Sequence, residues 1–249
     1  MAWIESHSPS FSARHDSNKS DQANRVLNAL ERFRAEVLRL FDRAPAEVAV
    51  VLHPRPAALT LAHPWLPLAR MLAAPASRRY FAGWFSETEI HVLTPEALEQ
   101  RASRVAGSRE ALLRAPEHEY AHIVIGANNP ALPPPFSVAS FRRYVRWAWL
   151  CEGAAVWLAG QAPHLRAAIV RRLRDGRRPD FPPGPADAML LGGTLFALLE
   201  RLEGRAAAAY LATSPLDRSP RSLLGEAFGR RSPEVERDWR AELDGLRAG

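Results

Sequence analysis

The chain has 249 residues, of which 47% are hydrophobic, enough to bury one sizeable core or two smaller lobes that share a cleft. Charged residues interrupt the apolar runs well before the roughly 20 residues that a membrane-spanning helix needs, so no membrane span is expected. Cys151 is the only cysteine, which excludes an intrachain disulfide. Because the first residues also lack the pattern of a secretory signal, we expect a cytoplasmic protein.

The basic charge of the chain raises the question of a nucleic-acid partner. The formal net charge is +6 and the isoelectric point is near 10.3. Lys19 is the only lysine, so 33 − 1 = 32 of the basic residues are arginine, a bias that a GC-rich coding sequence produces. The basic clusters at 171–178 and 229–231 are short. We therefore expect solvated basic faces and no nucleic-acid partner; the alternative, an arginine-rich nucleic-acid binder, predicts affinity that falls steeply with salt.

The first half of the chain predicts one long helix and two strands. Residues 1–20 are polar and are expected to form a mobile leader. A helix is predicted from Ser20 or Asp21 to about Asp42, because apolar residues recur there at helical spacing. The β-branched run at 47–54 predicts a strand, and 55–80 has no clear pattern. A second strand is predicted within 86–96, with Ile90 and Val92 on one face.

The second half of the chain is predicted to be almost entirely helical. Thr94 and Pro95 open a first helix, and a proline-rich loop at 128–136 separates two later ones. The further helices are expected at about 109–125, 138–160, 163–175, 186–203, 205–213, 219–228 and 233–246. The sequence thus predicts an α+β fold, a small N-terminal sheet packed on a helical body, with residues 21–249 as a single domain.

The stretch PEHEYAHIVIG, residues 116–126, contains two histidines with metal-ligand spacing. His118 and His122 lie four positions apart, so on a helix both imidazoles project from one face and can reach one ion. Glu119 is rotated about 100° around the axis, where it can touch a water molecule bound to the metal. Two neutral nitrogen ligands and one carboxylate base are the chemical content of an HExxH motif. Pro116 either starts a short helix or kinks a longer one begun near Ser108.

Glu152 is the candidate for the third protein ligand that a zinc hydrolase needs. It is the only acid in the apolar run VRWAWLCEGAAVWLAG at 145–160. Burying a lone carboxylate there costs several kcal/mol unless a cation or strong donors compensate it. A zinc ion would do so. The alternatives are that Glu152 pairs with Arg143 or Arg146, or that it faces solvent.

HEYAH followed some thirty residues later by WLCEGAAVWL resembles the gluzincin metallopeptidases, in particular the bacterial peptidase-MA-like domains. The resemblance covers roughly residues 25–245. It implies a zincin-like fold with one Zn²⁺ per chain, held by His118, His122 and Glu152, and Glu119 as the general base of peptide-bond hydrolysis. It also implies that the strand around 90–93 is the edge strand that aligns an extended peptide substrate beside the metal.

The sequence departs from the gluzincin pattern at two places. The position four residues after the glutamate ligand, where such proteins usually carry a polar or acidic residue, is Val156. The segment 188–204, where such families often place an oxyanion-stabilising tyrosine, has none. Tyr144, Tyr210 and His164 are candidates for that role, but core or surface positions are the plainer interpretation of each.

Two functions therefore remain open on the sequence alone. The first is a zinc metallopeptidase acting on a peptide or protein substrate. The second is a catalytically impaired or inactive zincin-like protein that acts as a binding or regulatory module. Of the other histidines, His53 and His63 are expected in loops, and His91 is expected to be exposed unless its strand borders the cleft. Cys151 is expected to be a small buried packing residue. The oligomeric state cannot be read from the sequence.

Overall fold

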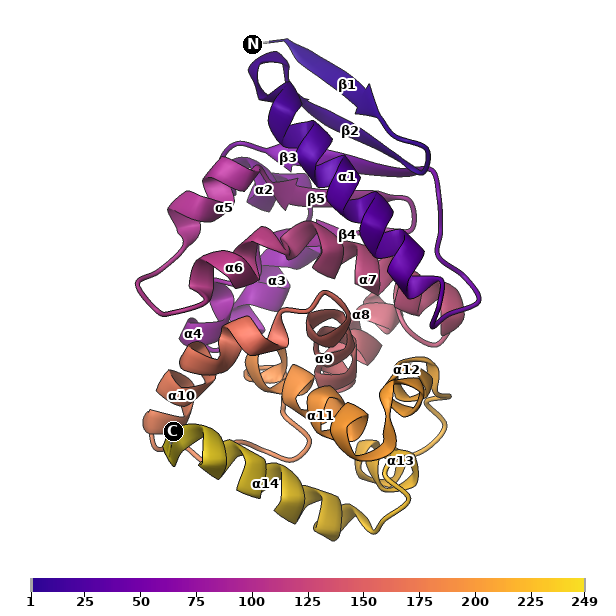
Figure 1. Ribbon diagram of the computed structural model, residues 1–249, viewed down its shortest axis with the longest axis vertical. Coiled ribbons are helices and arrows are strands. Elements are labelled where there is room, and N and C mark those ends of the chain that lie inside the picture. The colour runs from indigo at the N-terminus through magenta and orange to yellow at the C-terminus, as the bar shows by residue number, and fades with distance from the viewer. Residues whose placement is uncertain (1, 249) are drawn as a thin grey trace.

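A mixed β-sheet forms one end of the molecule in the computed structural model, which describes residues 2–248 (Figure 1). Its strands follow the order β1-β2-β3-β5-β4. β2, β3 and β5 run parallel to one another, whereas β1 pairs antiparallel with β2 and β4 antiparallel with β5. The strand bounds are β1 Trp3–His7, β2 Phe11–Asp16, β3 Val48–His53, β4 Gly83–Phe85 and β5 Glu89–Leu93.

The helical body follows the sheet, with yellow α14 at the opposite end of the molecule from β1 (Figure 1). Thr94 caps α5, since its hydroxyl accepts a hydrogen bond from the Ala97 amide at 3.3 Å, and Pro95 lies in the first turn as predicted. The helices are α1 Ser20–Val37, α2 Pro56–Ala62, α3 Trp65–Leu72, α4 Pro75–Arg78, α5 Pro95–Arg101, α6 Ser108–Leu113, α7 Ala115–Asn128, α8 Val138–Arg146, α9 Ala148–Leu158, α10 Arg166–Arg174, α11 Ala188–Glu203, α12 Arg205–Thr213, α13 Pro220–Ala227 and α14 Ser232–Ala248, with short 3₁₀ turns η1 Ser17–Lys19 and η2 Ala162–Leu165.

One face of the sheet packs on α1 and α7 and places β4 against α7. The strand register puts Val50, Ile90 and Phe85 on this face, and all three are buried. The ring of Phe11 meets the ring of Tyr120 on α7 edge-on, with 5.0 Å between centroids. The apolar face predicted for the second strand, with Ile90 and Val92 inward, is therefore confirmed.

Helix α9 lies at the centre of the body and is buried on all sides, as expected for a helix that is apolar all round. It crosses α11 with the two backbones in contact. A Cβ atom added at Gly153 would lie 2.6 Å from the carbonyl carbon of Gly192, and one added at Gly192 would lie 2.6 Å from the Trp149 carbonyl oxygen. The two glycines therefore allow this close crossing, which fixes the position of α9.

The α+β prediction is confirmed, but two of the predicted long helices are broken. The helix expected at 109–125 is divided at Arg114 into α6 and α7, so Pro116 lies in the first turn of α7. The helix expected at 138–160 is divided at Trp147, whose φ of −108° and ψ of 22° are not helical. The first helix also ends at Val37, five residues before the predicted Asp42.

The prediction of a mobile leader at residues 1–20 is wrong for the described part of the chain. Residues 3–16 form the antiparallel pair β1 and β2, and β2 also pairs with β3. Phe11, Ala13 and His15 on β2 are buried, which anchors this segment to the sheet. The helix then begins at Ser20, as predicted.

The prediction that the strand around 90–93 is the edge strand is also wrong. β5, which contains Ile90–Leu93, pairs with β3 on one side and β4 on the other, so its backbone groups are already used. The edge strand beside α7 is β4, which sequence patterns do not reveal because it has three residues.

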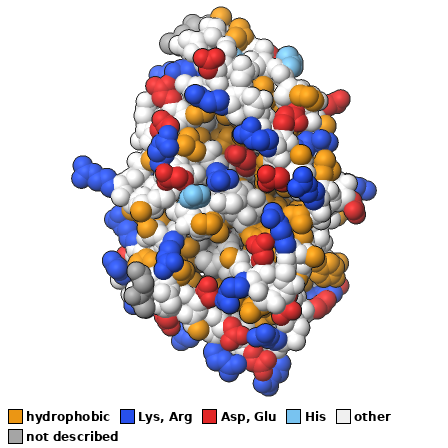
Figure 2. All heavy atoms as spheres, viewed as in Figure 1, with side chains coloured by type: hydrophobic (Ala, Val, Ile, Leu, Met, Phe, Trp, Pro, Cys, Tyr) orange, Lys and Arg blue, Asp and Glu red, His pale blue; other side chains and the backbone are white. Residues whose placement is uncertain are grey.

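The surface carries charges of both signs. On the face shown in Figure 2, Lys and Arg side chains lie among Asp and Glu side chains, with hydrophobic side chains between them. Some surface charges of the described chain pair, as Arg240 does with Glu236 at 2.6 Å. On that face the basic residues therefore form a mixed, solvated surface. No helix in residues 2–248 is both long enough and apolar enough to cross a bilayer.

Candidate metal centre

Helix α7 presents His118 and His122 toward the same point. Their Nε2 atoms are 3.1 Å apart, and the two rings meet edge-on with 4.8 Å between centroids. His118 lies in the first turn of α7, where its amide donates to the Arg114 carbonyl at 3.0 Å. The break at Arg114 therefore does not disturb the i, i+4 geometry on which the prediction rested.

Glu152 of α9 completes the cluster from the opposite side. Its Oε2 atom is 3.3 Å from His118 Nε2, and its Oε1 atom is 3.5 Å from His122 Nε2. Among the described residues, these three are the only group of three or more His, Cys, Asp and Glu side chains that could hold one metal ion, with possible ligand atoms within 4.8 Å of one another. Helices thirty residues apart in the sequence thus converge on a site that could hold a metal ion.

Two of the separations between these possible ligand atoms are close to those around a tetrahedral ion. Zinc lies about 2.0–2.1 Å from nitrogen and oxygen ligands, and the edge of such a tetrahedron is ~3.3 Å. The two Nε2 atoms are 3.1 Å apart and Glu152 Oε2 is 3.3 Å from His118 Nε2, close to that value, whereas the 3.5 Å contact with His122 is made by the other oxygen, Oε1. Glu152 Oε2 is also buried without a hydrogen-bond partner, which an ion would compensate. Two imidazoles and a carboxylate leave one position of the tetrahedron free for water or substrate.

Gln161 fixes the tautomer of His118. Its Nε2 amide group donates to the Ala111 carbonyl at 2.7 Å, which turns its Oε1 atom toward His118 Nδ1 at 2.8 Å. An amide oxygen only accepts, so His118 Nδ1 carries the proton and Nε2 keeps its lone pair for a metal. Gln161 therefore orients a histidine from outside the ligand set, which is the task that Val156 cannot perform.

Tyr144 of α8 donates a hydrogen bond from its hydroxyl to Glu152 Oε1. In a continuous helix, residues 144 and 152 would lie about 12 Å apart along the axis. The break at Trp147 brings them together. Burial works to raise the pKa of Glu152, but the neighbouring His122 and His118 and the hydrogen bond from Tyr144 outweigh it and lower the pKa, so the carboxylate is ready to bind a cation.

Glu119 lies beside the ligands and against β4. A Cβ atom added at Gly83 would lie 2.6 Å from Glu119 Cγ and 2.7 Å from its Oε1, so the carboxylate occupies the space that this glycine leaves. Burial raises the pKa of Glu119 to about 8, although His118 and Arg70 of α3 oppose the shift. In metal-free protein, a carboxyl group with this raised pKa exchanges a proton near neutral pH.

The site is closed to solvent. His118, His122 and Glu152 are 2–3% exposed and Glu119 is 5% exposed. The ring of Phe85 on β4 is stacked on His122, with 4.2 Å between centroids and 14° between planes. Phe136, from the proline-rich loop, lies next to Phe85 at 5.1 Å between centroids. A peptide would reach the ligands only after β4 or this aromatic cover moved.

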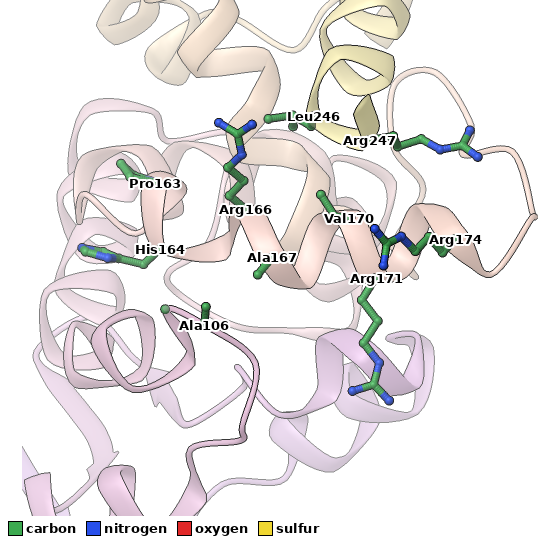
Figure 3. Close-up of a pocket in the computed structure, with 11 residues that line it drawn as sticks. Ala106, Pro163, His164, Arg166, Ala167, Val170, Arg171, Arg174, Leu246 and Arg247 are labelled. Carbon is green, nitrogen blue, oxygen red and sulfur yellow. The ribbon is translucent and has the colours of Figure 1, made fainter. Parts of the chain in front are cut away.

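The other residues singled out in the sequence lie in several places. Tyr144 reaches the site, but through Glu152; Tyr210 is 60% exposed on α12. His164 lies in η2 beside a separate hollow, where Figure 3 shows its ring. Cys151 and Val156 are buried packing residues. The pairing of Glu152 with Arg143 is not present, since Arg143 donates to the Ala131 carbonyl at 2.9 Å.

The prediction that His91 is exposed is wrong. Its side chain is 14% exposed, and its Nδ1 lies 3.0 Å from Nε2 of His53. His53 is at the buried end of β3, not in a loop, and His63 follows α2 with its ring centroid 6.0 Å from that of His91. These histidines cover the sheet face opposite α7.

Sequence reasoning missed Gly83, Phe85 and Gln161. Gln161 lies beyond the end of α9, where no spacing rule relates it to His118. Gly83 and Phe85 belong to a strand too short to show alternation. Comparison with known proteins gives no match for this chain: no family model, curated protein or solved structure matches it.

Proposed function

We propose that this chain is a zinc-dependent peptidase of the gluzincin type. The observation that carries the proposal is the convergence of His118, His122 and Glu152, whose possible ligand atoms lie within 4.8 Å of one another, with Glu119 beside them. A zinc ion held there would polarise the scissile carbonyl and lower the pKa of a bound water molecule toward 7. Glu119 would accept the proton of the attacking water and deliver it to the leaving amine nitrogen.

The substrate would align along the free edge of β4. Ser86 N donates to Glu89 O at 2.8 Å, which fixes the pattern of the antiparallel pair: every second residue of β4 hydrogen-bonds to β5. The residues between them, Gly83 and Phe85, therefore turn their N–H and C=O groups to the opposite edge of β4. In the described chain that edge pairs with no other strand. An extended peptide added there would lie along the strand that contacts Glu119 and His122, and would reach them once the cover of Phe85 and Phe136 moved.

A second candidate function, a metal-binding module without catalysis, is favoured by the burial of the site. The four side chains are nearly inaccessible, and Phe85 covers His122. In that case the ion would stabilise the contact between α7 and α9 and would not meet a substrate.

Elemental analysis and a peptide-cleavage assay test the proposal together. Purified protein should contain one zinc per chain, and Glu152→Ala should lose it. Glu119→Gln should keep the zinc and abolish hydrolysis, whereas Glu117→Gln, two positions earlier on α7 and outside the ligand group, should keep both. Protein that stays metal-free in excess zinc would refute the site. Zinc-loaded protein that cleaves no member of a peptide library would leave the binding module as the function.

A further inference from the structure

A cavity of about 500 Å³ lies between α3, α4 and α5 and is lined by four arginines, Arg70, Arg78, Arg79 and Arg101. We call it the arginine pocket. Within the described residues, none of the four has a carboxylate oxygen within 4.0 Å, whereas Arg109 on the neighbouring α6 pairs with Glu99. Four like charges around one cavity are unfavourable unless an anion offsets them.

The arginines are held in place by backbone carbonyls. Arg101 donates from Nε to the Arg79 carbonyl at 2.6 Å and from Nη2 to the Arg78 carbonyl at 2.9 Å. Arg79 Nη1 donates to the Arg101 carbonyl at 2.7 Å, and Arg78 Nε to the Ala73 carbonyl at 2.9 Å. These bonds orient the guanidinium groups but leave both Nη atoms of Arg78 and Nη1 of Arg101 without a hydrogen-bond acceptor in the described chain.

The charges in the pocket act on one another. Burial, and then the charge of Arg101, lower the pKa of Arg70 to about 10. Burial and the charge of Arg79 also lower the pKa of Arg101. Arg70 forms the inner wall, where it donates from Nη2 to the Phe81 carbonyl at 2.7 Å, just before β4. Arg70 thus links the pocket to the segment that leads into β4 and also feels the charge of Glu119, whereas Arg78, Arg79 and Arg101 have no carboxylate within 4.0 Å in the described chain.

We infer that the arginine pocket binds a phosphate group. A phosphate dianion offsets two positive charges and accepts several hydrogen bonds at once, and guanidinium groups match its oxygens in a bidentate way. The unused Nη atoms supply such donors. The phosphate proposal does not rest on the proposed peptidase activity, because the residues with unused donors, Arg78 and Arg101, are neither metal ligands nor the general base; Arg70 alone also acts on Glu119.

A second arginine-lined hollow serves as a comparison for the arginine pocket. This hollow, of about 610 Å³, lies beside α10 and α14. Figure 3 shows that its arginines diverge, with Arg166 and Arg171 extending to opposite sides of α10 and Arg247 pointing away from both. It therefore provides control positions, Arg166 and Arg174, which are exposed and carry the same charge.

Titration calorimetry of the full chain with inorganic phosphate, at fixed ionic strength, tests the inference. We expect saturable binding that Arg78→Gln and Arg79→Gln each weaken about tenfold to a hundredfold, the loss of one charge-assisted contact. Both residues are exposed, so both variants should fold. Arg166→Gln and Arg174→Gln should bind as wild type does. No saturable binding, or an equal loss in the control variants, would overturn the inference.

Binding to lipid vesicles distinguishes two sources of the phosphate group, a lipid headgroup and a soluble phosphate ester. The segment beside the pocket exposes large apolar side chains, Leu61 at 88% and Met71 at 73%, which could enter a membrane interface. Co-sedimentation with phosphatidylcholine vesicles that requires added phosphatidic acid, and is lost in Arg78→Gln, would assign a lipid headgroup. Phosphate binding without co-sedimentation would assign a soluble phosphate ester. The calorimetric titration decides whether the phosphate site exists, and the vesicles decide only which of the two sources it takes.

Discussion

Substitution of Gly83 by alanine should damage the proposed chemistry without removing the metal. The new Cβ atom would lie 2.6–2.9 Å from three side-chain atoms of Glu119. Ordinary contacts between such atoms are about 3.5–4.0 Å, so one side must move by roughly 1 Å. Since φ of Gly83 is not in the left-handed region, this contact and not backbone strain is the source of the effect.

The magnitude of the Gly83→Ala effect follows from two opposing contributions. Overpacking costs about 1–3 kcal/mol, and the reduced freedom of the unfolded chain returns about 0.4–1 kcal/mol. We expect a net loss of stability of about 0.5–2 kcal/mol. If Glu119 is the general base, as proposed, its displacement by about 1 Å should lower kcat by roughly a hundredfold, while zinc content stays at wild type because the three proposed ligands are untouched.

Gly245→Ala is the matched control for this experiment. Gly245 lies in α14 with no atom within 4 Å of an added Cβ, so the change should raise stability by about 0.5–1 kcal/mol and leave kcat unchanged. The prediction is tested by measuring the thermal melting, zinc content and kcat of both variants. If Gly83→Ala behaves as Gly245→Ala does, β4 does not lie against Glu119 in solution, and the described cover of the site is incorrect.

Two further predictions concern the groups that orient the ligands. Gln161→Leu should weaken zinc binding about 10–100-fold, measured by competition with a chelating dye, because His118 loses the acceptor that fixes its tautomer; unchanged affinity would show that Gln161 does not set it. Tyr144→Phe should weaken zinc binding by a smaller factor, about fivefold for one lost hydrogen bond to Glu152, and much less than Glu152→Ala does. An effect as large as that of Glu152→Ala would mean that Tyr144 has a more direct role.

The parts of this molecule that follow from sequence are those set by local periodicity. His118 and His122 could be located because four residues make about one helical turn, and Glu152 because a carboxylate in an apolar helix needs a partner. Helix starts such as Thr94 followed by proline were correct for the same local reason.

The remaining features depend on contacts between distant segments. Tyr144 reaches Glu152 only because the chain bends at Trp147, a break for which the apolar run gives no signal. β1 has mostly exposed residues and exists because β2 pairs with it, so its composition resembles that of a loop. β4 is defined by its pairing with β5. Tertiary pairing overrides local pattern in each case.

Glu119 separates the two candidate functions on grounds of stability. Its pKa is raised to about 8 by burial, so in metal-free protein the folded state holds its proton more tightly than the unfolded chain does. Stability is then lost as the pH rises from about 4.5 toward 8, where the unfolded chain releases the proton first; by pH 7 the loss amounts to about 3 kcal/mol at most.

Glu119→Gln should therefore remove this pH dependence and melt higher than wild-type protein at pH 7 when both are metal-free. A residue that lowers stability and ligates nothing has no purpose in a purely structural metal site, whereas a general base is used in catalysis, where such losses of stability are tolerated. Equal melting temperatures across pH 5–8 would contradict this argument and weaken the case for the peptidase relative to the binding module.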